Sequence, residues 1–122
     1  MTTIDDGLLA STLAHLRAFV ACDTQNPPRA IDGAIFDAIE SALSGFYCVR
    51  TDYGDGAITL HARRGTPDLL FNVHLDTVPR SQAWRRDPFD LQITDEHAIG
   101  LGACDIKGGA AALIAAAVAS HG

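Results

Sequence analysis

The chain has 122 residues, of which 48% are hydrophobic and 20% are charged, and its formal net charge is −6. This composition is typical of one globular domain with enough apolar side chains to form a core. Because a general nucleic-acid-binding protein normally presents a basic face, the negative charge argues against that function.

The cysteines and the N-terminus indicate the cellular compartment. Cys22, Cys48 and Cys104 are odd in number and widely spaced, which favours a reducing environment over a disulfide framework. The first residues lack the basic start and apolar stretch of a signal peptide. The longest run of small apolar residues, 110–119, is too short to cross a bilayer. We therefore expect a cytoplasmic protein with no membrane partner and no nucleic-acid partner.

Two helices are predicted in the first third of the chain. Apolar residues at helical spacing predict an amphipathic helix from about residue 6 to residue 22. Asn26-Pro27-Pro28 ends this stretch, because a residue that precedes proline avoids helical angles. A second helix that ends near Gly45 is predicted from four apolar residues spaced by four: Ile31, Ile35, Ile39 and Leu43.

Extended segments follow these helices. Two short strands are predicted over 46–51 and 57–62, joined by a turn in which Gly54 and Gly56 tolerate positive φ. Residues 69–73 are nearly all apolar, which is the pattern of a central strand covered on both faces.

The last third of the chain combines a hairpin with a helix. Residues 91–94 and 98–100 predict the hairpin, and an alanine-rich helix is predicted over 108–120. This order of elements predicts a three-layer α/β architecture with a mixed sheet. In such a unit the last helix returns the chain to another strand, so we expect residues 1–122 to be the N-terminal part of a larger domain.

His74 and Asp76 come directly after the predicted central strand. Alternate residues of a strand point the same way, so both side chains leave one face together. Imidazole is a good zinc ligand, and a nearby carboxylate fixes which ring nitrogen binds. A lone histidine is more often structural, but the carboxyl end of a central strand is where open α/β sheets bind their ligands. The position therefore favours a metal-binding or catalytic role.

A glycine-rich turn before the last helix contains a second isolated carboxylate, Asp105. Alone it is also compatible with an ordinary turn residue. A phosphate loop would need glycine before Lys107, and Asp105 replaces the third glycine of a dinucleotide-binding fingerprint, so neither nucleotide motif fits. The adjacent Cys104 could in principle bind a metal, but a small buried thiol that packs beneath the loop is the favoured interpretation.

Three stretches carry a resemblance to the zinc-dependent aminoacylase and carboxypeptidase family, which includes acetylornithine deacetylase and succinyl-diaminopimelate desuccinylase. They are residues 74–79, 84–89 and 100–109, and the similarity runs in register over essentially the whole chain. Residues 24–30 and 71–79 look closest to the acetylornithine and acetylcitrulline deacetylase branch. One departure is Leu101, where many relatives have arginine, and it leaves the ligand positions intact.

The resemblance implies roles for three residues. His74 would ligate one zinc ion, Asp76 would act in catalysis by orienting and polarising that histidine, and Asp105 would bridge two metal ions and precede a cis peptide bond. Cobalt could replace zinc. The family's glutamate general base, its other ligands and its dimerisation domain would lie outside these 122 residues, so the chain alone is expected to be inactive.

The expected fold is thus the N-terminal portion, residues 1–122, of a three-layer αβα zinc-peptidase-like catalytic domain. The complete enzyme, expected to be a homodimer, would hydrolyse an N-acetyl amino acid to acetate and the free amino acid in arginine biosynthesis. Two alternatives stay open. One is a non-catalytic remnant or interaction module of the same fold. The other is a succinyl-diaminopimelate desuccinylase or dipeptidase of the same family.

Overall fold

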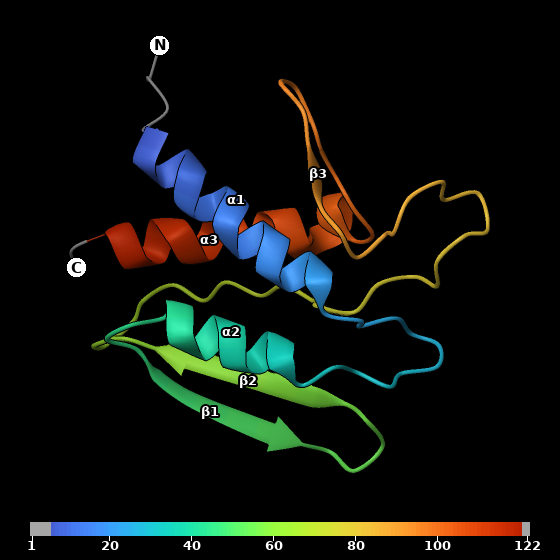
Figure 1. Cartoon of the computed structure of the whole chain (residues 1–122). Coiled ribbons are helices and arrows are strands. Elements are labelled where there is room, and N and C mark those ends of the chain that lie inside the picture. Colours follow the sequence, from blue (N-terminus) through green and yellow to red (C-terminus); the bar gives the residue numbers. More distant parts are fainter. Residues whose placement is uncertain (1–5, 121–122) are drawn as a thin grey trace.

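The computed structural model describes residues 6–120, which form three helices and two hairpins (Figure 1). The helices are α1 (Asp6–Ala21), α2 (Ala34–Ala42) and α3 (Gly108–Ala119), and a short irregular helical segment, η1 (Ala103–Lys107), leads into α3. The strands are β1 (Tyr47–Asp52), β2 (Ile58–Arg63), β3 (Gln92–Ile93) and β4 (Ala98–Ile99). No helix among the described residues is long and apolar enough to cross a membrane.

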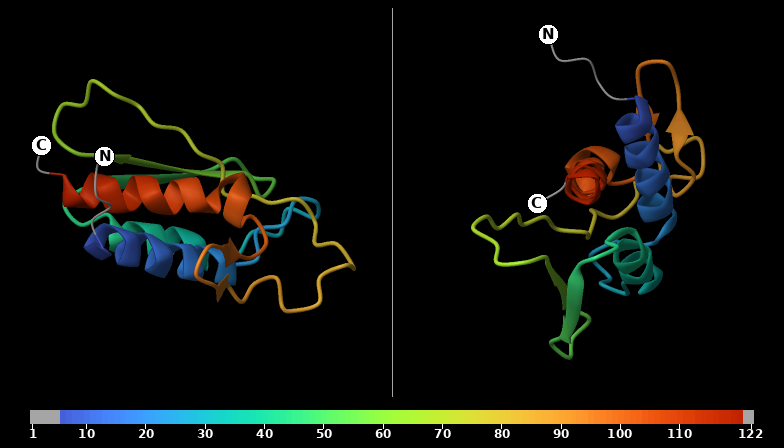
Figure 2. Two further views of the ribbon diagram at one scale, coloured as in Figure 1. Left: turned by 90° about the horizontal axis from the view of Figure 1, so that it is seen from above. Right: turned by 90° about the vertical axis from the view of Figure 1, so that its left-hand side faces the viewer.

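Helices α1 and α3 cross and pack against each other (Figures 1 and 2). Phe19 and Val20 of α1 are fully buried there, and α3 contributes small side chains such as Ala110 and Ala111. Small residues let two helix backbones approach closely while the large α1 side chains fill the space between them. Full burial of a side chain such as Phe19 contributes about 1.5–3 kcal/mol to folding.

Helix α2 lies against one face of the β1–β2 hairpin, as Figure 2 shows. It buries Ile35, Phe36 and Ile39. Strand β2 alternates between half-buried and exposed residues, and its inward side chains, Ile58 and Leu60 among them, pack against the same core. This alternation follows from the two-residue period of a strand with one covered face.

Most of the predicted elements are confirmed within one to three residues. The turn between β1 and β2 closes with a hydrogen bond from the Tyr53 amide to the Ala57 carbonyl, 2.9 Å, and Gly54 and Gly56 both have positive φ. Helix α2 begins at Ala34 rather than Ile31. The reason is local, because the Asp32 carboxylate accepts a hydrogen bond from the Ala34 amide, 3.0 Å, and so satisfies a free donor of the first turn.

The predicted central strand over 69–73 is wrong for this structure. The segment runs as an unpaired loop between β2 and α3 (Figure 1), and Leu70 and Phe71 are 82% and 65% exposed. A central strand needs a hydrogen-bonded neighbour on each edge and a cover on each face. Residues 6–120 supply neither here, and the nearest pairing is an isolated parallel bridge between Gln25 and Thr77.

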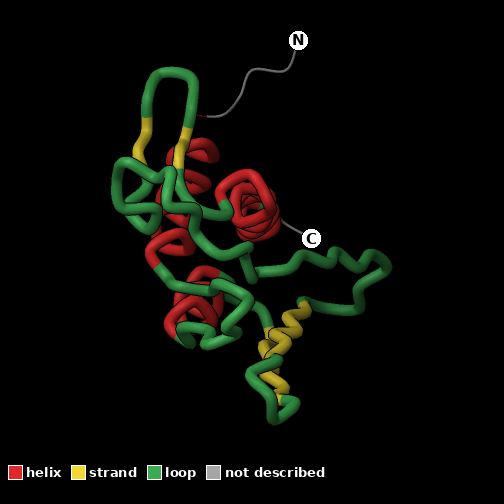
Figure 3. Tube along the Cα trace, turned by 90° about the vertical axis from the view of Figure 1, so that its right-hand side faces the viewer, coloured by secondary structure: helices red, strands yellow, loops and turns green. Residues whose placement is uncertain are grey.

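The predicted mixed sheet is also not formed by the described residues. They make two separate antiparallel pairs, β1–β2 and β3–β4, which lie far apart in Figure 3. The chain therefore combines helices with small antiparallel sheets and corresponds to part of an α/β domain.

Candidate metal centre

The structure brings His74 and Asp105 into direct contact although 31 positions separate them in the sequence. The His74 Nε2 atom lies 3.0 Å from an Asp105 carboxylate oxygen. Both side chains are solvent-accessible, with the imidazole 52% and the carboxylate 80% exposed. An imidazole nitrogen and a carboxylate oxygen that face each other in an accessible place are a suitable donor pair for a cation.

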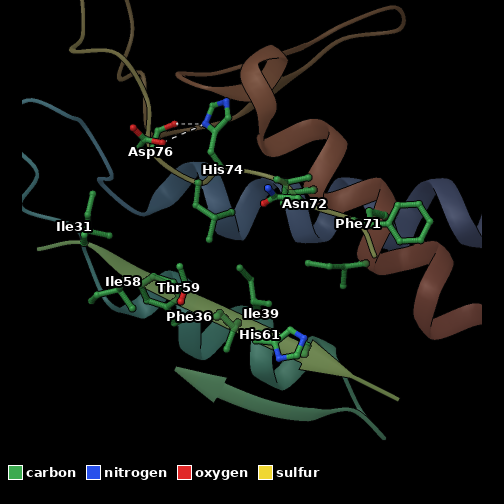
Figure 4. A pocket seen from close by; sticks show the side chains of 18 of the residues that line it. Ile31, Phe36, Ile39, Ile58, Thr59, His61, Phe71, Asn72, His74 and Asp76 are labelled. Atoms are coloured by element: carbon green, nitrogen blue, oxygen red, sulfur yellow. Dashed lines mark hydrogen bonds and ion pairs between the residues drawn. The ribbon is translucent and has the colours of Figure 1, made fainter. Parts of the chain in front are cut away.

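Asp76 holds the other side of the His74 ring (Figure 4). The Nδ1 atom of His74 lies 3.1 Å from the Asp76 backbone oxygen and 3.3 Å from its carboxylate. The Asn26 side-chain amide donates a 3.2 Å hydrogen bond to the second Asp76 carboxylate oxygen. Because Nδ1 is directed at Asp76, Nε2 is the nitrogen turned toward Asp105, as a carboxylate–histidine–metal arrangement requires.

The electrostatics of this cluster favour positive charge on the histidine. Partial burial acts to lower the pKa of His74, but the hydrogen bonds to the Asp76 backbone and the Asp105 carboxylate outweigh it, and the pKa is raised. Both ring nitrogens face oxygen acceptors, and only a doubly protonated ring donates to both. Nε2 of His74 and the Asp105 carboxylate thus face each other across a position at which positive charge is favoured.

The loop that carries Asp105 is shaped by its glycines. Gly102 has a φ of 78°, and a Cβ atom added there would lie 2.4 Å from the Thr77 side chain. Glycine is needed both for the left-handed conformation and for this close approach, which presses the Asp105 loop against the segment that follows Asp76. The Asp105–Ile106 peptide bond is cis, as the family resemblance implies.

An elongated cavity of about 580 Å³ leads away from the site (Figure 4). It lies between β2, α2, α3 and residues 70–76, and most of its lining is apolar. Its polar lining includes His74 and Asp76 at one end (Figure 4), and Asn26, which is hydrogen-bonded to Asp76. The candidate metal-binding face is therefore continuous with an apolar trough.

The candidate centre is incomplete within residues 6–120. No group of three or more His, Cys, Asp or Glu side chains in this part of the chain is placed to hold a metal ion. A structural zinc site is normally four-coordinate, and a catalytic one uses three protein ligands. The interpretation of Cys104 as a buried thiol is wrong, because that side chain is exposed. Its neighbours in the turn direct it to solvent while Lys107 occupies the interior.

Sequence reasoning gave several residues beside the site no role in it. Asn26 was interpreted as part of a helix stop and of a stretch that resembles the family, and its contact with Asp76 was not anticipated. Thr24 and Lys107 are almost fully buried beside the site. The one available signal was that Lys107 is the only lysine in a chain that otherwise uses arginine for its basic residues.

Comparisons with known proteins agree with this geometry. Residues 70–121, which include His74, Asp76 and Asp105, match peptidase family M20/M25/M40. The chain is 58% identical over 117 residues to N-acetyl-L-citrulline deacetylase of Xanthomonas campestris pv. campestris, a match that covers 94% of this chain and 32% of that protein. It is 40% identical over 116 residues to succinyl-diaminopimelate desuccinylase of Rhodospirillum rubrum, covering 88% of this chain and 29% of the relative.

A similar desuccinylase of Maricaulis maris is 38% identical over 113 residues, covering 88% of this chain and 28% of the relative. The chain thus spans about a third of the length of the curated relatives that it matches. The family match and these relatives, which are similar along most of the 122 residues, show that the chain belongs to peptidase family M20/M25/M40.

Proposed function

We propose that this chain is the N-terminal part of the catalytic domain of a metal-dependent amidohydrolase that deacetylates an N-acetyl amino acid, with N-acetylcitrulline or N-acetylornithine as the first substrates to test. The observation that carries the proposal is the 3.0 Å approach of His74 and Asp105, which lies in the part of the chain that matches the family. The 58% identity to an N-acetyl-L-citrulline deacetylase supports the choice of substrate class.

In this proposal His74 and Asp105 hold zinc or cobalt, and Asp76 orients His74. The donor set fits, because two bonds of about 2.0–2.2 Å from one ion span a nitrogen and an oxygen at the observed separation. A bound metal ion would supply Lewis acidity toward the amide carbonyl and toward a water molecule. The residues of this chain then have the task of holding the donor atoms and fixing the orientation of the imidazole ring.

The rest of the site is proposed to come from segments outside residues 1–122. The family resemblance implies a glutamate general base, further ligands and a dimerisation domain, and no described residue replaces them. We infer that the three-layer αβα arrangement forms when those segments pack on this chain. Arginine biosynthesis, a cytoplasmic location and a homodimeric complete enzyme are parts of the same proposal.

Zinc titration of the 122-residue chain tests the metal role. We expect weak binding, followed by calorimetric titration in the wild type and in every variant, and no detectable hydrolysis of N-acetylcitrulline. His74→Ala should abolish the binding, and Asp105→Asn, which keeps the shape but removes the charge, should weaken it about tenfold or more. His97→Ala is the matched control, because this exposed histidine lies in the β3–β4 turn. Zinc affinity unchanged in both site variants would contradict the proposal.

A second candidate is desuccinylation, because several relatives at 38–43% identity are succinyl-diaminopimelate desuccinylases. A complete protein that contains this chain should be assayed on acetylcitrulline, acetylornithine and succinyl-diaminopimelate. Preference for the succinylated substrate would replace the deacetylase proposal with this one. A non-catalytic remnant of the fold is distinguished by the coding sequence beyond codon 122, where an immediate stop codon would favour it.

A further inference from the structure

Residues 22–26 contact both the segment that carries His74 and Asp76 and the loop that carries Asp105. They connect α1 to the proline-containing loop, and Thr24 at their centre is fully buried. The Thr24 hydroxyl donates a 2.7 Å hydrogen bond to the Leu75 carbonyl, and the Thr24 carbonyl accepts one from the Thr77 amide at 2.9 Å. Thr24 is therefore hydrogen-bonded to the two residues that flank Asp76.

Asn26 extends this contact by one residue. Its backbone amide donates to the Thr77 carbonyl at 2.9 Å, and its side chain donates to the Asp76 carboxylate. The backbone of 24–26 thus runs beside 75–77 as a short parallel pairing, within which Gln25 bridges to Thr77. The direction of the His74 and Asp76 side chains depends on the position of this backbone.

The Asp105 loop is attached to the same segment through Lys107. The Lys107 side chain is 1% exposed, and its ammonium donates a 3.1 Å hydrogen bond to the Cys22 carbonyl. The Lys107 amide also donates to the Gly102 carbonyl at 2.9 Å, which closes the loop around Asp105. A buried ammonium is costly unless its hydrogen bonds are satisfied, so this contact holds the loop in one position.

We propose that residues 22–26 are the template of the metal centre: Thr24 positions the segment that carries His74 and Asp76, and Lys107 positions the Asp105 loop, on one shared stretch of backbone. The inference rests on the proposed function, because it explains how two donors from distant segments keep their separation. Donor groups must be held within about 0.5 Å for a functional site. Thr24 and Lys107 are buried and act through the donor residues, so they are positioning residues.

A matched set of variants of the 122-residue chain tests the role of Thr24. Thr24→Val removes the hydroxyl with little change of shape, Thr24→Ser keeps it, and Thr12→Val removes a hydroxyl whose hydrogen bond is to Leu8 within α1. With zinc as the probe and the His74 ring as the NMR reporter, we expect about tenfold weaker binding for Thr24→Val. Thr24→Ser and Thr12→Val should stay within about twofold of the wild type. Wild-type affinity in a folded Thr24→Val chain would overturn the proposal.

Zinc binding by a Lys107 variant and the metal-free ¹⁵N shifts of the His74 ring complete the test. If Thr24→Val does not fold, Lys107→Met, which keeps the buried length without the charge, takes its place; about tenfold weaker zinc binding supports the template and unchanged binding overturns it. If the wild-type chain binds too little zinc to measure, because two donors alone hold the ion weakly, the metal-free spectra decide the positioning role. Altered ¹⁵N shifts of the His74 ring in Thr24→Val but not in Thr24→Ser support it, and unaltered shifts overturn it.

Discussion

The two sides of this molecule contain similar apolar sequences but cover them very differently. At the crossing of α1 and α3, Phe19 is fully buried, whereas Phe71 in the unpaired segment beside β2 is mostly exposed. The residue type is the same, so the difference lies in the neighbours. Burial of an apolar side chain stabilises only when another surface removes it from water. On the helical side of the molecule, where α1 and α3 cross, other residues of 6–120 supply the covering surface. The segment over 69–73 depends on a cover that these residues do not provide.

The largest expected effect compares the two phenylalanines directly. Phe19→Ala removes a fully buried side chain and should lower the free energy of unfolding by about 3–5 kcal/mol. Phe71→Ala changes an exposed site and should stay within about 0.5 kcal/mol. Urea unfolding followed by circular dichroism measures both values. Equal losses in the free energy of unfolding would mean that Phe71 is covered in solution, and the contrast between the two phenylalanines would then be wrong.

Lys107 tests how strongly the helical side excludes water. Burial lowers its pKa from the ordinary 10.5 to about 8. Between pH 8 and pH 10.5 the unfolded chain keeps a proton that the folded chain has released, so the free energy of unfolding should rise with pH. The total rise is at most about 3.5 kcal/mol, since the two pKa values differ by about 2.5 and one pKa unit corresponds to about 1.4 kcal/mol.

The control for this prediction is Lys107→Met, measured over the same pH range. Cys22 opposes the lysine, because burial raises the pKa of its thiol and stability falls once the unfolded thiol ionises. Cys22 is present in both proteins, so the wild-type stability should rise relative to that of the variant from pH 8 to pH 10.5. If the free energy of unfolding of the two proteins changed in parallel with pH, the Lys107 ammonium would be hydrated in the folded state. Water would then reach the helical side despite its close packing.

The same contrast explains what the sequence could predict. Helical periodicity located α1 and α2, the alanine-rich composition located α3, and the two glycines located the β1–β2 turn, because these signals are local. The motif resemblance indicated that His74 and Asp105 would belong to one site. The prediction of a strand over 69–73 was wrong because an apolar run shows that a segment can be buried. It does not show whether a surface that covers the segment is present.

The template residues were missed for a related reason. Thr24 bonds to a residue 51 positions away and Lys107 to one 85 positions away. A threonine or a lysine in a polar stretch has the same local appearance whether it is exposed or buried. Their roles arise only when α1, the His74 segment and η1 pack together, which no periodicity records.

The smallest expected effect on stability, and a clear one on solubility, comes from Leu70→Lys. Leu70 is 82% exposed and adjoins Phe71 in a segment whose backbone is unpaired, which is the arrangement that promotes edge-to-edge association. A lysine there adds charge without removing a buried contact, so stability should change by less than about 0.5 kcal/mol. The aggregated fraction of the 122-residue chain, measured by light scattering at fixed concentration, should fall.

Leu9→Lys is the matched control for this change. Leu9 is 46% exposed on α1, where the helix satisfies its own backbone hydrogen bonds, so the same added charge should reduce aggregation less. If both variants reduced aggregation equally, net charge alone would explain the result. A specific effect of Leu70→Lys would instead locate the association at the uncovered segment, because there an exposed apolar side chain accompanies backbone groups that lack a strand partner within residues 6–120.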